Sequence, residues 1–136
     1  MDEPAPLVAA FAAHYLSIGA SEVHIFLDQP DPEAEALLAG LPRVYLTVCD
    51  AAYWKVNKPR KRPEMHFSRQ CRNAQKVYET TKADWLLHCD ADEYVQDGEA
   101  VVAALTAAPD VALYMRLLVA ERVTLAEEPQ SGIFDG

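Results

Sequence analysis

The chain has 136 residues and a formal charge of −9, with 51% hydrophobic and 24% charged residues. This length fits one domain with its own core, so we predict a single domain over residues 1–136. The acidic balance argues against nucleic-acid binding, and no apolar run reaches the roughly 18 residues that a membrane helix needs. Three cysteines without a CxxC spacing favour free thiols in a reducing compartment, so we expect a cytoplasmic protein.

The first part of the chain alternates helical and strand patterns. Apolar residues recur at helical spacing over residues 5–18, which predicts an amphipathic helix. Two apolar runs with β-branched and aromatic residues, 22–27 and 44–49, predict buried strands. Between these strands, Asp31 is placed to cap a helix that has Pro32 at its first position.

The second part of the chain begins with residues 51–66, which show no clean period and hold two prolines, so we predict a long loop there. Four residues at helical spacing then mark a helix: Phe67, Cys71, Ala74 and Tyr78. The predicted elements are a helix over about 67–82, a strand over 85–89, a helix from 97 through 108 and a strand over 111–119.

Helices that alternate with short, nearly all-apolar strands predict an α/β fold, with a mainly parallel sheet and helices on both faces. Ligands of such sheets bind beyond the carboxyl ends of the strands. Three of the predicted strands are followed directly by an acid: Asp28, Asp50 and Asp90. We therefore expect the chemistry of the chain at this rim.

The positive charge of the chain is concentrated in residues 55–82. This segment holds nine of the 12 Lys and Arg residues and only two of the 21 Asp and Glu residues, so it carries +7 while the rest of the chain carries −16. A basic segment in an acidic chain indicates a local anionic ligand such as a phosphate group. A solvated loop followed by a helix with one charged face would give the same pattern. The aromatic pair Tyr53-Trp54 beside Lys55 is open to two interpretations, stacking on a base or sugar and anchoring the loop.

The sharpest motif is Asp90-Ala91-Asp92-Glu93, which directly follows the apolar run 85–89. Carboxylates beside a core are costly unless they are paired or bound to a cation. Hard oxygen ligands two residues apart can share one Mg²⁺ or Mn²⁺ ion and leave positions for water and a diphosphate. Asp90 and Asp92 are therefore the candidate metal ligands.

Residues 83–95 (ADWLLHCDADEYV) resemble the signature of family-2-like bacterial glycosyltransferases, in which a Trp-Leu-Leu strand runs into Asp-x-Asp-Glu. Residues 11–19 are similar to the helix, His and small-Gly segment of the same family, and Gln70 falls where the family often has Gln. The resemblance covers roughly residues 3–95, and the acidic motif is its most specific part.

The resemblance implies a GT-A-like, Rossmann-like domain that binds a nucleoside-diphosphate sugar and transfers the sugar to an acceptor, which would be a glycan, a lipid or a protein. By this resemblance, Asp92 is the main metal ligand, and Asp90 approaches both the metal and the sugar-nucleotide. Asp28 matches the acid that lies near the nucleoside. Arg72 is a diphosphate partner by its charge and position alone, and no catalytic residue is assigned.

Two departures from the family pattern shape the expected activity. The family begins with a central strand before its first helix, whereas here only three residues precede Pro4. The family also continues well past the acidic motif into an acceptor-binding half. We therefore expect self-association through unpaired strand edges, and little transferase activity from the 136 residues alone. The alternative is a non-catalytic GT-A remnant that acts as a binding module. A receiver-type regulator fits less well, because no Lys follows a fifth strand.

Overall fold

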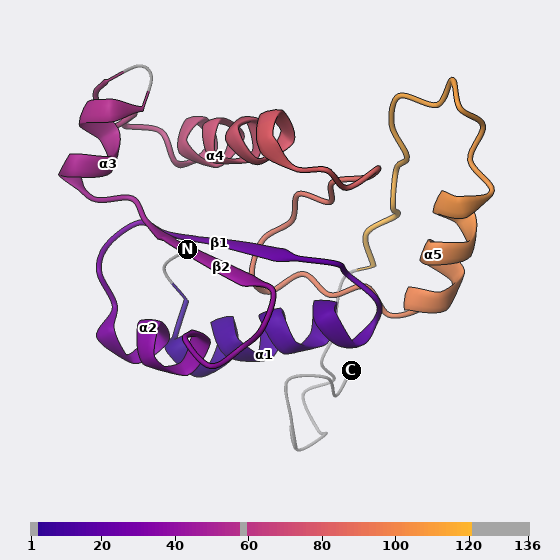
Figure 1. The fold of residues 1–136 in the computed structure, drawn as a ribbon, viewed down its shortest axis with the longest axis horizontal. Helices are drawn as coiled ribbons and strands as arrows, with labels where there is room; N and C mark the ends of the chain where they lie inside the picture. The colour runs from indigo at the N-terminus through magenta and orange to yellow at the C-terminus, as the bar shows by residue number, and fades with distance from the viewer. Residues whose placement is uncertain (1–2, 58–59, 121–136) are drawn as a thin grey trace. The chain divides into compact units, whose positions relative to one another are not determined.

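The computed structural model describes residues 3–57 and 60–120. The chain divides into two compact units, residues 1–106 and 107–136. The helices and strands of the described residues belong to the first unit (Figure 1). In chain order they are α1 (Ala5–Ser17), β1 (Val23–Leu27), α2 (Pro32–Leu38), β2 (Val44–Val48), α3 (Ala51–Val56), α4 (His66–Thr80) and α5 (Gly98–Thr106).

A parallel β1–α2–β2 unit forms the centre of this part of the chain. The strands pair in register from Val23 opposite Val44 to Leu27 opposite Val48. The Asp31 carboxylate accepts hydrogen bonds from two backbone N–H groups in the first turn of α2, as expected of an N-cap residue. The predicted strands, the helix between them and its cap are thereby confirmed.

The hydrophobic core lies between this unit and α1. Val23, Ile25 and Leu27 are buried and alternate with half-buried residues, so they point to one face of the sheet. α1 packs against this face and against α2, and it contributes the buried side chains of Val8 and Phe11. The predicted helix over 5–18 is confirmed, and its apolar stripe is the face that it buries.

α4 lies on the opposite side of the strands from α1 and α2 (Figure 1). Polar contacts attach it near both ends of β1. Arg69 in its first turns binds Asp28, which follows β1, and the Thr81 hydroxyl donates to the Glu22 carboxylate just before β1 at 2.6 Å. The protein is therefore a mixed α/β structure, with a small parallel sheet and helices on both sides of it.

The predicted loop over 51–66 is wrong in its first third, where α3 forms. Asp50 caps this helix, because its side chain accepts a hydrogen bond from the Tyr53 N–H at 2.8 Å. The helix is only six residues long, too short to show a hydrophobic period. Its cap was the local signal, since Asp is a favoured N-cap residue.

The predicted strands over 85–89 and 111–119 are also wrong. Within the described residues the sheet has two strands, β1 and β2, and neither apolar run joins it. Leu86 and Leu87 are exposed, as are most of the apolar side chains of 111–119. A strand needs the backbone of a neighbour to complete its hydrogen bonds, and apolar composition alone does not supply one.

α5 confirms the helix predicted from residue 97. The Asp97 carboxylate accepts a hydrogen bond from the Ala100 N–H at 2.9 Å and so caps the helix. The first residue of α5 must be small, because a side chain at Gly98 would collide with Ile18 at the end of α1. No helix in the described ranges has the length and apolarity to cross a bilayer.

Candidate functional site

The site begins where β1 and β2 end. The Cys49 N–H donates to the Leu27 carbonyl at 2.8 Å, so the pairing of the strands continues to this edge. Asp28 and Asp50 then follow the two strands, as the sequence predicts. Asp50 serves as the cap of α3, which leaves Asp28 as the acid with long-range partners here.

Both carboxylate oxygens of Asp28 are bound by arginines. Arg69 donates through Nε to Oδ1 at 3.0 Å and through Nη2 to Oδ2 at 2.7 Å, and Arg62 donates to Oδ2 at 3.0 Å. Burial raises the pKa of Asp28, but the hydrogen bonds and charge of Arg69, together with the charge of Arg62, hold that pKa below its ordinary value. Asp28 is therefore an ionised and neutralised acid.

Arg69 also holds the segment that directly precedes α4. Its Nη1 donates to the carbonyls of Pro63 and Glu64, at 3.1 and 2.8 Å. The Arg69 side chain is 10% exposed, whereas that of Arg62 is 45% exposed. Arg69 is thus a buried structural cation that joins β1, α4 and the segment before α4, and Arg62 is the one of the two that solvent reaches readily.

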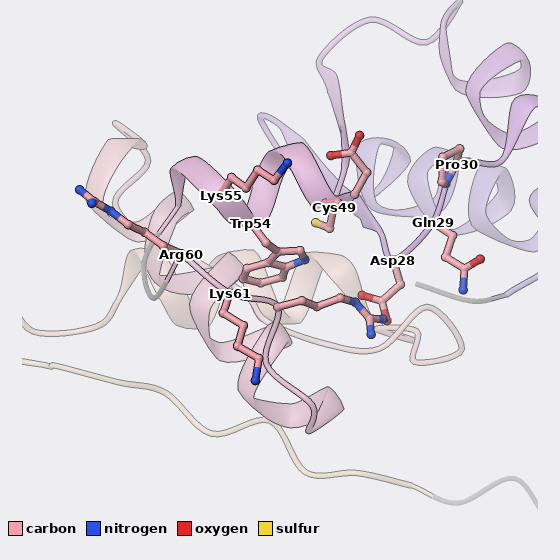
Figure 2. A pocket seen from close by; sticks show the side chains of 11 residues that line it. Asp28, Gln29, Pro30, Cys49, Trp54, Lys55, Arg60 and Lys61 are labelled. Carbon is pink, nitrogen blue, oxygen red and sulfur yellow. The ribbon is translucent and has the colours of Figure 1, made fainter.

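A pocket of about 400 Å³ opens beside Asp28, beyond the ends of both strands. Its walls combine apolar surface with the side chains of four cationic residues. These residues are Lys55, Arg60, Lys61 and Arg62. Figure 2 shows the Asp28 carboxylate and the Arg60 guanidinium on opposite sides of the Trp54 indole. Four cations of the basic segment identified in the sequence therefore line one open pocket, and their charge favours an anionic ligand there.

Trp54 forms the apolar wall of this pocket and is only 2% exposed. Its Nε1–H has no hydrogen-bond partner among the described residues. A buried donor without a partner costs about 1–3 kcal/mol.

The neighbouring Tyr53 hydroxyl donates to the Asn73 side chain of α4 at 2.8 Å, and burial raises the pKa of Tyr53 to about 12. α3 is thus held against α4, which agrees with the interpretation of this aromatic pair as an anchor.

The Asp90–Glu93 segment forms a self-capped turn. The Glu93 carboxylate accepts from the Asp90 N–H at 2.9 Å, and the Glu93 N–H donates to the Asp90 carbonyl at 3.2 Å. The Asp90 carboxylate accepts a hydrogen bond from Gln70 of α4. Ala91 is buried in the core, whereas Asp90 and Asp92 are exposed. Glu93 therefore shapes the turn, and the two aspartates face solvent.

α1 holds this turn in place. The Tyr15 hydroxyl donates to the Glu93 carbonyl at 3.0 Å, and His14 Nε2 lies 2.9 Å from the Val95 carbonyl oxygen. Burial raises the pKa of the Tyr15 hydroxyl well above its usual range, so this group remains a donor at every physiological pH.

We expect Tyr15→Phe to lower the free energy of unfolding by about 1 kcal/mol, because the Glu93 carbonyl loses its donor. Amide hydrogen exchange should quicken in residues 90–95 more than in β1. Tyr45→Phe is the matched control, since Tyr45 is half exposed on β2 and should change neither quantity. Equal exchange in Tyr15→Phe and the native chain would contradict this role of α1.

The acidic side chains of the described residues do not make up a metal site by themselves. In the described part of the chain, no cluster of three or more His, Cys, Asp or Glu side chains is arranged to hold a metal. Mg²⁺ is commonly bound by one or two carboxylates together with substrate phosphates and water. The roles of Asp90 and Asp92 as metal ligands therefore stay predictions.

The predicted acids thus have different surroundings, and one important residue was missed. Asp28 and Asp90 are brought to neighbouring residues of α4, Arg69 and Gln70. Arg72 is exposed on the same helix. Arg69 was missed because the apolar residues of α4 suggested that a different face of the helix is buried.

Comparison with protein-family models, with curated proteins and with solved structures finds no match for this chain.

Proposed function

We propose that this chain is a GT-A-like glycosyltransferase domain, which binds a nucleoside-diphosphate sugar together with Mg²⁺ or Mn²⁺. The resemblance of residues 83–95 to the family signature supports this function. A mixed α/β structure with a parallel strand pair is compatible with part of such a fold.

One observation carries the proposal. Asp28 follows β1 and Asp90 lies 62 positions later, yet their partners are the adjacent residues Arg69 and Gln70 of α4. The first turns of α4 therefore connect the acid that matches the nucleoside side of a donor site with the acid that matches its metal side. The basic pocket opens beside the first of these acids.

The residues of the chain would divide the binding of such a donor among them. Lys55 and Lys61 would attract the diphosphate, and Arg62 is exposed enough to exchange part of its contact with Asp28 for a phosphate oxygen. Asp90 and Asp92 would hold the metal ion. When bound, that ion would neutralise the charge on the departing nucleoside diphosphate. The acceptor, whether glycan, lipid or protein, is outside this assignment.

The proposal predicts that Asp92→Asn weakens Mn²⁺-dependent binding of the donor by at least about tenfold, because one of two anionic ligands is lost. Calorimetry with UDP-, GDP- and CDP-sugars, with and without Mn²⁺, measures this effect. Asp84→Asn is the matched control, because Asp84 is an exposed acid outside the motif. Equal affinities in the native chain and Asp92→Asn would overturn the metal assignment.

A non-catalytic binding module is the second candidate. The observation that favours it is the saturation of Asp28, because both of its oxygens already bind arginines. A catalytic domain should release nucleoside diphosphate from at least one donor in the presence of Mn²⁺ and an acceptor. Tight metal-dependent binding without any turnover across glycan, lipid and protein acceptors would support the binding module instead.

A further inference from the structure

The basic pocket carries more positive charge than the protein itself neutralises. Among the described residues, its lining holds two acids, Asp28 and Asp50, and four cations, which are Lys55, Arg60, Lys61 and Arg62. Asp28 is already matched by Arg69, which is not part of this lining. Asp50 alone is then left to set against the four cations, so the positive charges are in excess by three. A phosphate monoester carries about −1.5 to −2 at pH 7, so two linked phosphates match this excess better than one.

The cations are spread along the pocket. Figure 2 shows the side chains of Lys55 and Lys61 on opposite sides of the Trp54 indole. Arg62 stands at the Asp28 end, where it donates to Oδ2 at 3.0 Å. A guanidinium has five N–H donors, so Arg62 can hold Asp28 and a ligand oxygen at the same time. A ligand with two phosphate groups can therefore contact cations on both sides of the ring.

The wall of the pocket also contains a buried donor that lacks an acceptor. Trp54 is 2% exposed and lines the pocket, and its Nε1–H has no hydrogen-bond partner among the described residues. In Figure 2 the nitrogen edge of the indole is turned toward Asp28. Both oxygens of Asp28 already accept hydrogen bonds from arginines. A ligand oxygen held by Arg62 in this part of the pocket would supply the missing acceptor.

We propose that this pocket binds a diphosphate group directly, without a metal ion, and that the Trp54 Nε1–H donates to the bound anion. Lys55, Lys61 and Arg62 supply charge-assisted hydrogen bonds to the phosphate oxygens. The identity of the natural ligand, the diphosphate of the sugar donor, rests on the proposed function. The inference deepens that function, because it makes the pocket an anion site that works independently of the metal.

The experiment is calorimetry of the full 136-residue chain with sodium pyrophosphate, in a buffer that contains EDTA. Pyrophosphate should bind at least about tenfold more tightly than orthophosphate, because it makes more charge-assisted contacts. The double variant Lys55→Gln/Lys61→Gln should bind pyrophosphate at least about tenfold more weakly, because two of these contacts are lost. Both side chains are exposed, so this variant should keep the native circular dichroism and thermal midpoint.

Lys76→Gln/Lys82→Gln is the matched control. It removes the same charge from two exposed positions that are not part of the pocket lining. Because salt screens exposed charges that do not contact the ligand, this variant should bind pyrophosphate within about twofold of the native chain.

The indole N–H resonances give a second readout. Trp54 and Trp85 are the two tryptophans of the chain, and Trp54→Phe assigns their signals. Pyrophosphate should shift the Trp54 Nε1–H signal downfield, because that group gains an acceptor. The Trp85 signal should stay in place, since Trp85 is not part of the pocket lining.

Absence of pyrophosphate binding, or binding that requires Mn²⁺, overturns this inference and leaves the metal-dependent donor site of the proposed function standing. Equal losses in the two double variants, or an unmoved Trp54 signal on binding, would also overturn it. Metal-free binding of pyrophosphate, with no binding of any sugar donor in the presence of Mn²⁺, would support the pocket as an anion site and contradict the proposed function.

Discussion

Replacing Arg69 with methionine is expected to lower the free energy of unfolding by about 3 kcal/mol, because the variant removes the main partner of the buried Asp28 carboxylate. Arg69 is 10% exposed and donates four hydrogen bonds, two to Asp28 and two to backbone carbonyls. Methionine preserves much of the apolar stem but none of these donors. Arg62 remains in contact with Asp28 in this variant, so the acid retains one partner.

Arg72→Met is the matched control, because Arg72 is an exposed arginine on the same helix. It should change the free energy of unfolding by less than about 0.5 kcal/mol. Urea unfolding followed by circular dichroism measures both variants. A loss of the same size in both, or a negligible loss in Arg69→Met, would show that the ion pair does not hold α4 to the sheet.

The acid dependence of stability gives a second measurement of the same contact. The folded-state pKa of Asp28 lies below its unfolded value, which is about 3.9. The stabilisation from its ionised form is therefore fully present above pH 4 and is lost as the pH falls through the folded-state pKa. In Arg69→Met the folded-state pKa should rise, so the unfolding free energy should fall less steeply between pH 4 and pH 2 than in the native chain.

Trp54→Ala is expected to cost about 3–5 kcal/mol, the range for removing a large buried aromatic side chain. Trp54 is among the largest fully buried side chains in the described residues, and it forms part of the wall of the basic pocket. The cavity left by the indole would merge with that pocket. A change this large is a substantial part of the 5–15 kcal/mol by which domains are stable, so the variant should unfold at much lower denaturant concentration.

Trp54→Phe is the informative control for this variant. It keeps most of the ring and removes the Nε1–H, which has no partner among the described residues, so it should cost less than half as much as Trp54→Ala. Urea unfolding compares the two variants directly. Equal losses would show that the indole nitrogen makes an important contact, and a small loss in Trp54→Ala would show that the α3 anchor is dispensable.

The sequence was most informative where local patterns and packing agreed. α1 was predicted from the helical period of its apolar residues, and β1 and β2 from short apolar runs with β-branched and aromatic residues. The cap of α2 at Asp31 was predicted as well. The run over 85–89 failed for the opposite reason, because its apolar residues indicate burial but no backbone neighbour among the described residues completes a ladder.

The site was predictable only in outline. The strand ends identified Asp28, but not that Arg69 binds it, because the existence of α4 was read from Phe67, Cys71 and Tyr78, which turn out to be exposed. The buried face of α4 is mainly polar. Arg69 on this face binds Asp28, which lies 41 residues earlier in the chain. Local periodicity cannot reveal such a choice, since it depends on which partner the fold brings near. The roles of Arg72, Asp90 and Asp92 in donor binding remain predictions.

The polar attachment of α4 has a consequence for the order of folding. Paired residues of β1 and β2 are 21 positions apart, whereas the contacts that attach α4 to the ends of β1 join residues separated by 41 and 59 positions. Closing a longer loop costs more chain entropy before any contact repays it. The β1–α2–β2 unit with α1 should therefore form the nucleus, and α4 should dock afterwards. The pocket beside Asp28 would then be completed only when Arg69 of α4 fixes the segment that carries Arg62.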